Sequence, residues 1–208
     1  MELRQIEAPV HGRVLFEERE HGLLLVGFHG YAETAGIHME ALRRLPDSKR
    51  WSLAAIQALH PFYLAKTGAV VAGWMTSEDR ELAIGDNIEY VRRVLATLPN
   101  QRRIVFLGFS QGVAMAFRAA AFAGASPAGV IGLGADMPTD VIEARPRLPP
   151  ALIARGTRDE WYTAEKFERD LAFLRGVTEV DTCVFEGGHE WSDRFLEVAG
   201  EFLSRVAR

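Results

Sequence analysis

The sequence predicts an α/β fold in which helices cover both faces of a mostly parallel sheet. Short apolar runs rich in β-branched residues alternate with longer stretches whose apolar residues recur at a helical period. This alternation is typical of strand–helix–strand units, whose strands lie parallel and side by side. One apolar run also ends in Gly-x-Ser-x-Gly, at residues 108–112, directly before a helical stretch.

The strand candidates begin with two apolar runs, at 14–19 and 23–28. They flank His21 and Gly22, and two runs joined by so short a turn predict an N-terminal antiparallel hairpin. Further strands are expected at 53–59, 103–109, 129–134, 151–155 and 180–186.

The helices are predicted from apolar residues that lie three and four positions apart. At about 79–98, Ile84, Ile88 and Val91 share one face, and Pro99 ends the pattern. The other helices are expected at about 34–45, 113–122, 163–175 and 192–206. The stretch 60–78 shows no period, so we expect an irregular connection there. Connections of this length are often functional or mobile, and the sequence leaves open whether this one acts as a flap.

Composition narrows the classes of function. The 208 residues are 48% apolar and 25% charged, which fits one globular domain over residues 1–208. A formal net charge of −4 without a basic run argues against a nucleic-acid partner. No apolar run is long enough to span a bilayer, and the N-terminus lacks a secretory pattern, so we expect no integral membrane segment. The lone Cys183 is expected to be a buried apolar residue in a cytoplasmic protein.

Ser110 lies between two glycines at the point where a strand becomes a helix. A residue on so sharp a turn takes a strained conformation, and side chains at positions 108 and 112 would crowd it, which explains Gly108 and Gly112. The following helix directs free N–H groups and the positive end of its dipole at the serine. Negative charge that develops during acyl transfer would be stabilised there. The pattern therefore favours a reactive hydroxyl over a turn that contains a serine by chance.

A reactive serine needs a base, and the base needs an orienting acid. Where a serine occupies such a turn, the acid and then the histidine follow it in the chain. His189 is the only histidine after Ser110, so we expect it to be the general base. Asp159, a few residues beyond the strand at 151–155, is the favoured acid. Asp136 is the main alternative, and Asp140, Asp181 and Asp193 are weaker candidates.

Two backbone N–H groups are expected to form the oxyanion hole: that of Gln111, next to the nucleophile, and that of Tyr31, in the loop after the strand at 23–28. His29 precedes the serine and lies on this oxyanion side, so we expect it to be structural. The candidates for the substrate pocket are aromatic or apolar side chains, although ordinary packing explains each of them taken singly: Phe62, Tyr63, Trp74, Met75, Trp161 and Trp191.

At this point the sequence resembles a known family. The motifs FHG (28–30), GFSQG (108–112), RGTRD (155–159) and GGHEW (187–191) occur in the order and spacing of the α/β-hydrolase fold. More narrowly, nearly the whole chain is similar to the phospholipase/carboxylesterase family, which includes bacterial carboxylesterases and acyl-protein thioesterases. The resemblance implies a hydrolase without a large lid domain, with Ser110, Asp159 and His189 as triad and the amides of Tyr31 and Gln111 as oxyanion hole. The family's oxyanion loop often has His-Gly-x-Gly, and here Ala32 replaces the second glycine.

The expected function is therefore that of a carboxylesterase-type serine hydrolase, which cleaves small-molecule esters or thioesters through an acyl-enzyme on Ser110. We expect neither a cofactor nor a metal ion. An acyltransferase or a peptidase could use the same three residues, and a non-catalytic homologue could keep the fold to bind a small ligand. The sequence leaves open the acyl chain length, the leaving group and the oligomeric state, a homodimer included.

Overall fold

The centre of the molecule is a seven-stranded sheet with the strand order β1-β3-β2-β6-β7-β8-β9. The computed structural model describes residues 1–19, 22–99 and 103–208. The strands of this sheet are β1 (Arg13–Glu17), β2 (Leu23–Phe28), β3 (Ser52–Gln57), β6 (Arg103–Phe109), β7 (Gly129–Leu133), β8 (Ala151–Gly156) and β9 (Val180–Phe185). Neighbouring strands are parallel, except that β1 runs antiparallel to β3.

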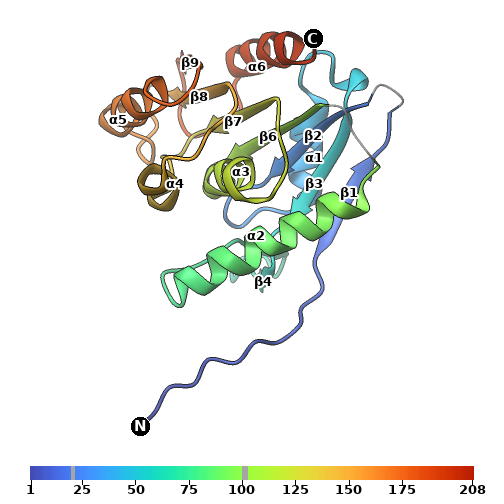
Figure 1. The fold of residues 1–208 in the computed structure, drawn as a ribbon, viewed down its shortest axis with the longest axis vertical. Helices are drawn as coiled ribbons and strands as arrows, with labels where there is room; N and C mark the ends of the chain where they lie inside the picture. Colours follow the sequence, from blue (N-terminus) through green and yellow to red (C-terminus); the bar gives the residue numbers. More distant parts are fainter. Residues whose placement is uncertain (20–21, 100–102) are drawn as a thin grey trace.

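Helices form a layer on each face of this sheet (Figure 1). One layer contains α2 (Arg80–Thr97), α3 (Gln111–Phe122), α4 (Thr139–Ala144) and α5 (Ala164–Arg175), and the other contains α1 (Ala35–Arg43) and α6 (Asp193–Val206). On β2, Leu24 and Val26 belong to the core of the first layer, whereas Leu23 and Leu25 belong to that of the second. Successive strand residues point to opposite faces, so a strand buried on both sides is apolar throughout.

The predicted fold class is confirmed, but the predicted N-terminal hairpin is wrong. β1 pairs with β3 rather than with β2. β2 is hydrogen-bonded to β3 along one edge and to β6 along the other, so it has no free edge for β1. The sequence correctly indicated a reversal of direction between the two runs, but it did not show that a later strand lies between them. His21, part of the predicted turn, lies outside the described residues.

The stretch 60–78 is more regular than the sequence predicted. It forms a small antiparallel hairpin of β4 (His60–Tyr63) and β5 (Val70–Gly73), in which Phe62 lies opposite Val71. These strands are short and most residues of β4 are exposed, so no apolar alternation announces them. The short helix α4 and a 3-10 turn at Ser48–Arg50 were not predicted either. Within the described ranges no larger lid is inserted, as expected.

The fold brings the predicted site residues to one edge of the sheet. Tyr31 follows β2, Ser110 follows β6, Asp159 follows β8 and His189 follows β9. These strands are parallel, so their carboxyl ends open on the same side, where α/β proteins bind their ligands. The first residues of the chain extend away from the body of the molecule (Figure 1).

Candidate active site

Ser110 occupies a strained turn between β6 and α3. Its backbone has φ 51° and ψ −125°, a conformation that residues other than glycine rarely adopt. A Cβ on Gly108 would overlap the carbonyl of Gly112, and a Cβ on Gly112 would overlap the carbonyl of Phe28. The two glycines are therefore required by the close approach of the backbone around Ser110. The Ser110 N–H donates to Leu133 O on β7 (2.9 Å), which fixes the turn at the end of the sheet.

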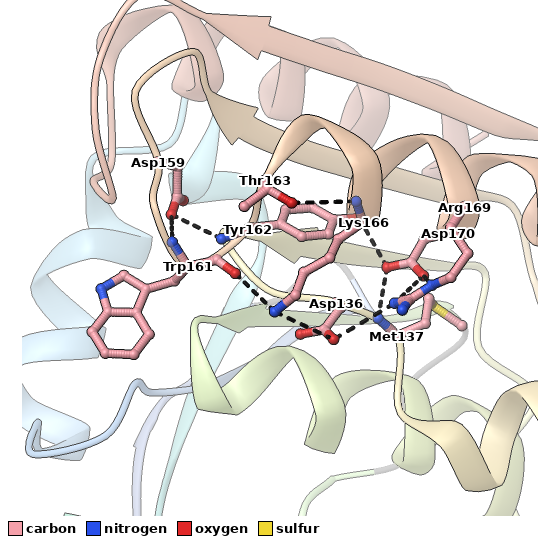
Figure 2. Close-up of polar contacts among 9 residues, drawn as sticks. All are labelled: Asp136, Met137, Asp159, Trp161, Tyr162, Thr163, Lys166, Arg169 and Asp170. Atoms are coloured by element: carbon pink, nitrogen blue, oxygen red, sulfur yellow. Dashed lines mark hydrogen bonds and ion pairs between the residues drawn. The ribbon is translucent and has the colours of Figure 1, made fainter.

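Asp159 and His189 form a hydrogen-bonded pair. Nδ1 of His189 lies 2.9 Å from Oδ2 of Asp159. The other carboxylate oxygen, Oδ1, accepts the backbone N–H groups of Trp161 (2.9 Å) and Tyr162 (3.0 Å), as Figure 2 shows. Asp159 is only 4% exposed, so its carboxylate is held in one orientation by these bonds. With Nδ1 donating to the carboxylate, Nε2 of the neutral ring is left as a proton acceptor.

Ser110 and His189 line the same cavity, which has a volume of about 480 Å³. Its other lining residues are Gly30, Tyr31, Glu33, Phe109 and Trp161. The volume lies in the range of small-molecule sites. Both Ser110 and His189 are described in full, and no hydrogen bond joins their side chains in this structure. In ligand-free enzymes this contact is commonly long and shortens when the substrate binds.

The predicted oxyanion donors lie on two segments that are both held by β5 and the residues that follow it. Among the described residues, neither the Tyr31 N–H nor the Gln111 N–H has a hydrogen-bond acceptor. The Gln111 side chain accepts the Trp74 N–H (2.8 Å) and donates to Met75 O (2.9 Å), so α3 is tied to the segment after β5. The two free N–H groups are suited to receive a negatively charged oxygen.

Ala32 gives the oxyanion loop the backbone shape that a glycine would give it. Its φ of 59° lies in the left-handed region. The Ala32 N–H donates to Ala72 O (3.0 Å), and the Ala72 N–H donates to Glu33 O (2.9 Å), so the loop is paired with β5. This pairing holds an alanine in a conformation that costs it energy.

Glu33 is a residue of this cavity that sequence reasoning missed. Its Oε2 accepts the Gly30 N–H (2.7 Å), which closes the turn between the two residues. Burial raises the pKa of the Glu33 carboxyl, while the Gly30 bond and nearby His189 oppose the rise. A single carboxylate after a loop has no motif of its own. The available signal was its position, three residues after the glycine of the oxyanion loop.

The other candidate acids are engaged elsewhere. Each forms an ion pair with a basic side chain: Asp136 with Lys166 and Arg169, Asp140 with Arg118, Asp181 with Arg205, and Asp193 with Arg44. Of the five aspartates considered, Asp159 is the one that meets His189.

The predicted pocket residues divide into two groups. Trp161 lines the cavity, and Phe62 stacks on Tyr31 with ring centroids 5.2 Å apart.

Trp74 and Met75 are instead buried in the core, where the Trp74 indole N–H donates to His29 O (2.9 Å). Trp191 packs against Phe109, His38 and Phe195 behind the cavity, and Tyr63 is exposed on the hairpin. The structure therefore brings Trp161 to the cavity, with Phe62 beside it, and leaves the other four aromatic or apolar candidates outside its lining.

Two further expectations concern buried side chains. His29 is structural, as expected: Nδ1 bonds Gly30 O (2.7 Å) and Nε2 accepts the Ala58 N–H (3.0 Å). Burial lowers the pKa of His29, so its ring is neutral. Cys183 is buried in β9, also as expected, and burial raises the pKa of its thiol.

The chain is similar to known proteins in its fold, but no comparison by sequence finds a match. No model of a protein family matches the chain, and no curated protein matches it either. Among solved structures, acyl-protein thioesterase 2 from Zea mays superimposes with a TM-score of 0.74 at 16% identity, over 95% of this chain and all of that one. A carboxylesterase from Bacillus cereus has a TM-score of 0.69 at 16% identity, over 94% of each chain. Esterase PE8 has a TM-score of 0.72 at 20% identity, over 95% of this chain and 100% of that one.

These matches extend over nearly the whole of both chains rather than over a fragment. In the described part of the chain, no helix has both the length and the hydropathy that a membrane crossing requires. Since the superpositions cover nearly all of the chain and the sheet has a parallel order with one antiparallel edge strand, the protein has the α/β-hydrolase fold.

Proposed function

We propose that this protein is a serine hydrolase of the carboxylesterase type, which cleaves carboxylic esters or thioesters through an acyl-enzyme on Ser110. The observation behind the proposal is the Asp159–His189 pair, which meets Ser110 at one cavity. Together, a strained serine, an oriented histidine and free N–H groups can act as nucleophile, general base and oxyanion hole. The names of the similar structures, a thioesterase, a carboxylesterase and an esterase, support an acyl substrate.

In the proposed reaction, the Ser110 hydroxyl attacks the acyl carbon while Nε2 of His189 accepts its proton. Asp159 keeps the ring oriented through Nδ1 and stabilises the imidazolium that forms. The Tyr31 and Gln111 N–H groups bind the oxyanion of the tetrahedral intermediate. The imidazolium then returns its proton to the departing alcohol or thiol.

Deacylation repeats the same steps with water. His189 removes a proton from the water molecule, which attacks the acyl carbon, and the carboxylic acid leaves as Ser110 regains its proton. Because His189 must be neutral to act as a base, we expect the rate to fall in acid. A rate that stays flat from about pH 5 to 8 under conditions where chemistry limits turnover would contradict this role.

The proposal is tested with p-nitrophenyl esters of increasing acyl length, next to matched thioester and peptide substrates. Wild-type protein should hydrolyse the esters or thioesters, and Ser110→Ala should reduce kcat by about 10⁴-fold or more. A fluorophosphonate probe should label the wild type at Ser110. The control is Ser77→Ala, which removes an exposed serine outside the cavity and should leave both readouts unchanged.

The outcomes separate the remaining alternatives. Turnover of peptides, or transfer of the acyl group to an alcohol in preference to water, would favour a peptidase or an acyltransferase. Absence of labelling and turnover in a folded wild-type protein would favour a binding protein. A single domain in the cytoplasm, without cofactor, is part of the same proposal, and its support is the lone buried Cys183 and the ordinary domain-sized composition.

A further inference from the structure

The charge of the cavity lining is one-sided. Of the described residues that line it, Glu33 is the acidic one and His189 is the basic one, and no lysine or arginine is among them. Among the ion pairs found in the described ranges, none involves Glu33. Among the described residues, the cavity therefore presents a carboxylate without a lysine or arginine partner, and His189 is the basic side chain beside it.

The Glu33 carboxylate lies beside the nucleophile. A Cβ placed on Gly30 would lie 3.2 Å from Glu33 Oε2 and 3.3 Å from Ser110 Cβ, so both groups border the same small space. The carboxylate is held there by the Gly30 N–H, which it accepts at 2.7 Å. A group bound at Ser110 is consequently close to a fixed negative charge.

Two aromatic rings extend this site. Tyr31 and Trp161 both line the cavity, and both are largely exposed, at 59% and 74%. The Tyr31 ring is supported from behind by Phe62, with an interplanar angle of 26°. Exposed aromatic faces next to a carboxylate attract organic cations, because the ring quadrupole and the negative charge act in the same direction.

The half-buried position of Glu33 favours the binding of a cation beside it. Partial burial disfavours the charged carboxylate, as the raised pKa of Glu33 shows. An alkylammonium group at the same site stabilises the charged form of Glu33 by electrostatic attraction. A carboxylate on the substrate is instead repelled by Glu33. A neutral alkyl group of the same shape would gain neither effect.

We propose that the cavity selects esters or thioesters that have an alkylammonium group near the scissile bond, and that Glu33 is the residue that determines this preference. This inference rests on the proposed hydrolase function. We assign to Glu33 a role in substrate specificity, since its carboxylate lines the cavity beside Ser110. We assign it no part in the proton transfers.

The kinetic test compares esters that differ only in charge. One pair has the charge in the leaving group, 2-(trimethylammonio)ethyl butanoate against 3,3-dimethylbutyl butanoate. A second pair has it in the acyl group, the p-nitrophenyl esters of 4-(trimethylammonio)butanoate and 5,5-dimethylhexanoate. At pH 8 the wild type should favour the ammonium member of at least one pair by about tenfold in kcat/KM, and should disfavour a p-nitrophenyl hemisuccinate.

Glu33→Gln keeps an oxygen that can accept the Gly30 N–H and removes only the charge. It should bring the ammonium preference, the ratio of kcat/KM within each pair, close to unity, whatever its effect on the absolute rates. The matched control is Glu160→Gln, which removes the same charge from an exposed side chain next to Trp161 that does not line the cavity. It should keep the wild-type preference. Equal ratios in wild type and Glu33→Gln, or no ammonium preference in the wild type, would overturn the inference.

A binding measurement separates this inference from the hydrolase proposal. Butyltrimethylammonium should bind Ser110→Ala in calorimetry, and about tenfold more weakly when Glu33→Gln is added. Turnover of neutral esters with no charge preference and no effect of Glu33→Gln on binding overturns the cation site and leaves the hydrolase standing. Binding that depends on Glu33 in a protein without esterase activity overturns the hydrolase and keeps the cation site.

Discussion

The two loops that line the cavity are built alike and anchored differently. The oxyanion loop, residues 29–33, ends at Thr34, which caps α1, and the acid loop, residues 157–162, ends at Thr163, which caps α5. Each of these helices then buries one titratable side chain completely, His38 on α1 and Asp170 on α5. The two buried side chains have opposite surroundings.

Asp170 is fully engaged. It accepts the Met137 N–H (2.8 Å), the Tyr162 hydroxyl (3.2 Å) and the Arg169 guanidinium (2.8 Å), in the network of Figure 2. Tyr162 in turn donates its N–H to Asp159, so the network reaches the acid of the proposed triad. Arg155 also donates to Tyr162 O (2.7 Å), which ties the loop to β8. The acid loop is thus fixed by buried polar bonds.

His38 has no such partner. Neither of its ring nitrogens is hydrogen-bonded to any described residue. Gly27 on β2 leaves room for the ring, since a Cβ there would overlap it, and Trp191 contacts its edge. Burial lowers the pKa of His38 to about 3. The oxyanion loop is therefore supported by apolar packing beneath it, by backbone pairing with β5 and by the hydrogen bonds of Glu33 and His29 at Gly30. We infer that the acid loop depends mainly on ion pairs and hydrogen bonds with distant side chains, whereas the oxyanion loop depends mainly on its backbone shape.

The largest effect is expected at the acid itself. Asp159→Asn keeps the size of the side chain but holds the wrong tautomer of His189, because the amide N–H₂ donates to Nδ1 where the carboxylate accepted from it. We expect kcat to fall by about 10⁴-fold with little change in stability. Kinetics with a neutral ester measure the loss, and Asp136→Asn is the control, because Asp136 binds Lys166 and Arg169 instead of the histidine. A loss below about tenfold in Asp159→Asn would remove this residue from the triad.

The next effect is expected in the network beneath the acid loop. Asp170→Ala leaves the Met137 N–H and the Tyr162 hydroxyl without acceptors in a buried region. We expect the free energy of unfolding to fall by about 3 kcal/mol, measured by urea denaturation. Asp136→Ala breaks pairs between partly exposed groups in the same network and should cost under about 1 kcal/mol. Equal losses in the two variants would contradict the central place of Asp170.

His38 should show the opposite behaviour, with stability that depends on pH. Its folded pKa of about 3 lies below the ordinary value of 6.5. Below that ordinary value the unfolded chain binds a proton that the folded chain does not, so stability is lost as pH falls from about 6.5 toward 3. Between pH 7.5 and pH 5 the loss from this group is about 2 kcal/mol.

His38→Leu removes this proton uptake and fills the same space with an apolar side chain. We expect stability at pH 7.5 that equals or exceeds that of the wild type, and about 2 kcal/mol less decline on going to pH 5. Urea denaturation of both proteins at the two pH values gives the difference directly. The same decline in wild type and variant would show that His38 does not titrate as its surroundings require.

The comparison also shows what the sequence could predict. The strands of the main sheet and the helices that flank it follow from apolar periodicity, since burial on one or two faces dictates where apolar residues recur. The common location of Ser110, Asp159 and His189, each after the end of a parallel strand, also follows from the order of elements in the chain, and their proposed roles stay a prediction. What periodicity does not contain is which strands are neighbours, and so the pairing of β1 with β3 was missed.

The supporting polar residues could not be predicted for a different reason. Arg118 is buried in a mostly apolar helix, and its partner Asp140 lies 22 residues later, on α4. Asp170 follows an arginine on a helix and resembles an ordinary surface pair until the fold brings Met137 and Tyr162 to it. Such residues are defined by long-range partners, and a sequence pattern describes only local ones.

The smallest expected effect tests whether shape alone matters in the oxyanion loop. Ala32 has φ 59°, which costs an alanine about 1 kcal/mol relative to its preferred conformations. Ala32→Gly relieves that strain but also makes the unfolded chain more flexible, which costs about 0.5–1 kcal/mol. These terms nearly cancel, so we expect stability within about 1 kcal/mol of the wild type and unchanged turnover of a neutral ester.

Ala32→Val is the informative partner, because a β-branched side chain is strongly disfavoured at this φ. It should shift the loop, weaken its pairing with Ala72 and lower kcat with little change in KM, since the Tyr31 N–H would move away from the developing oxyanion. A wild-type kcat in Ala32→Val would contradict the role of the Tyr31 amide as a donor to the transition state. It would also contradict the inference that catalysis depends on the backbone shape of the oxyanion loop.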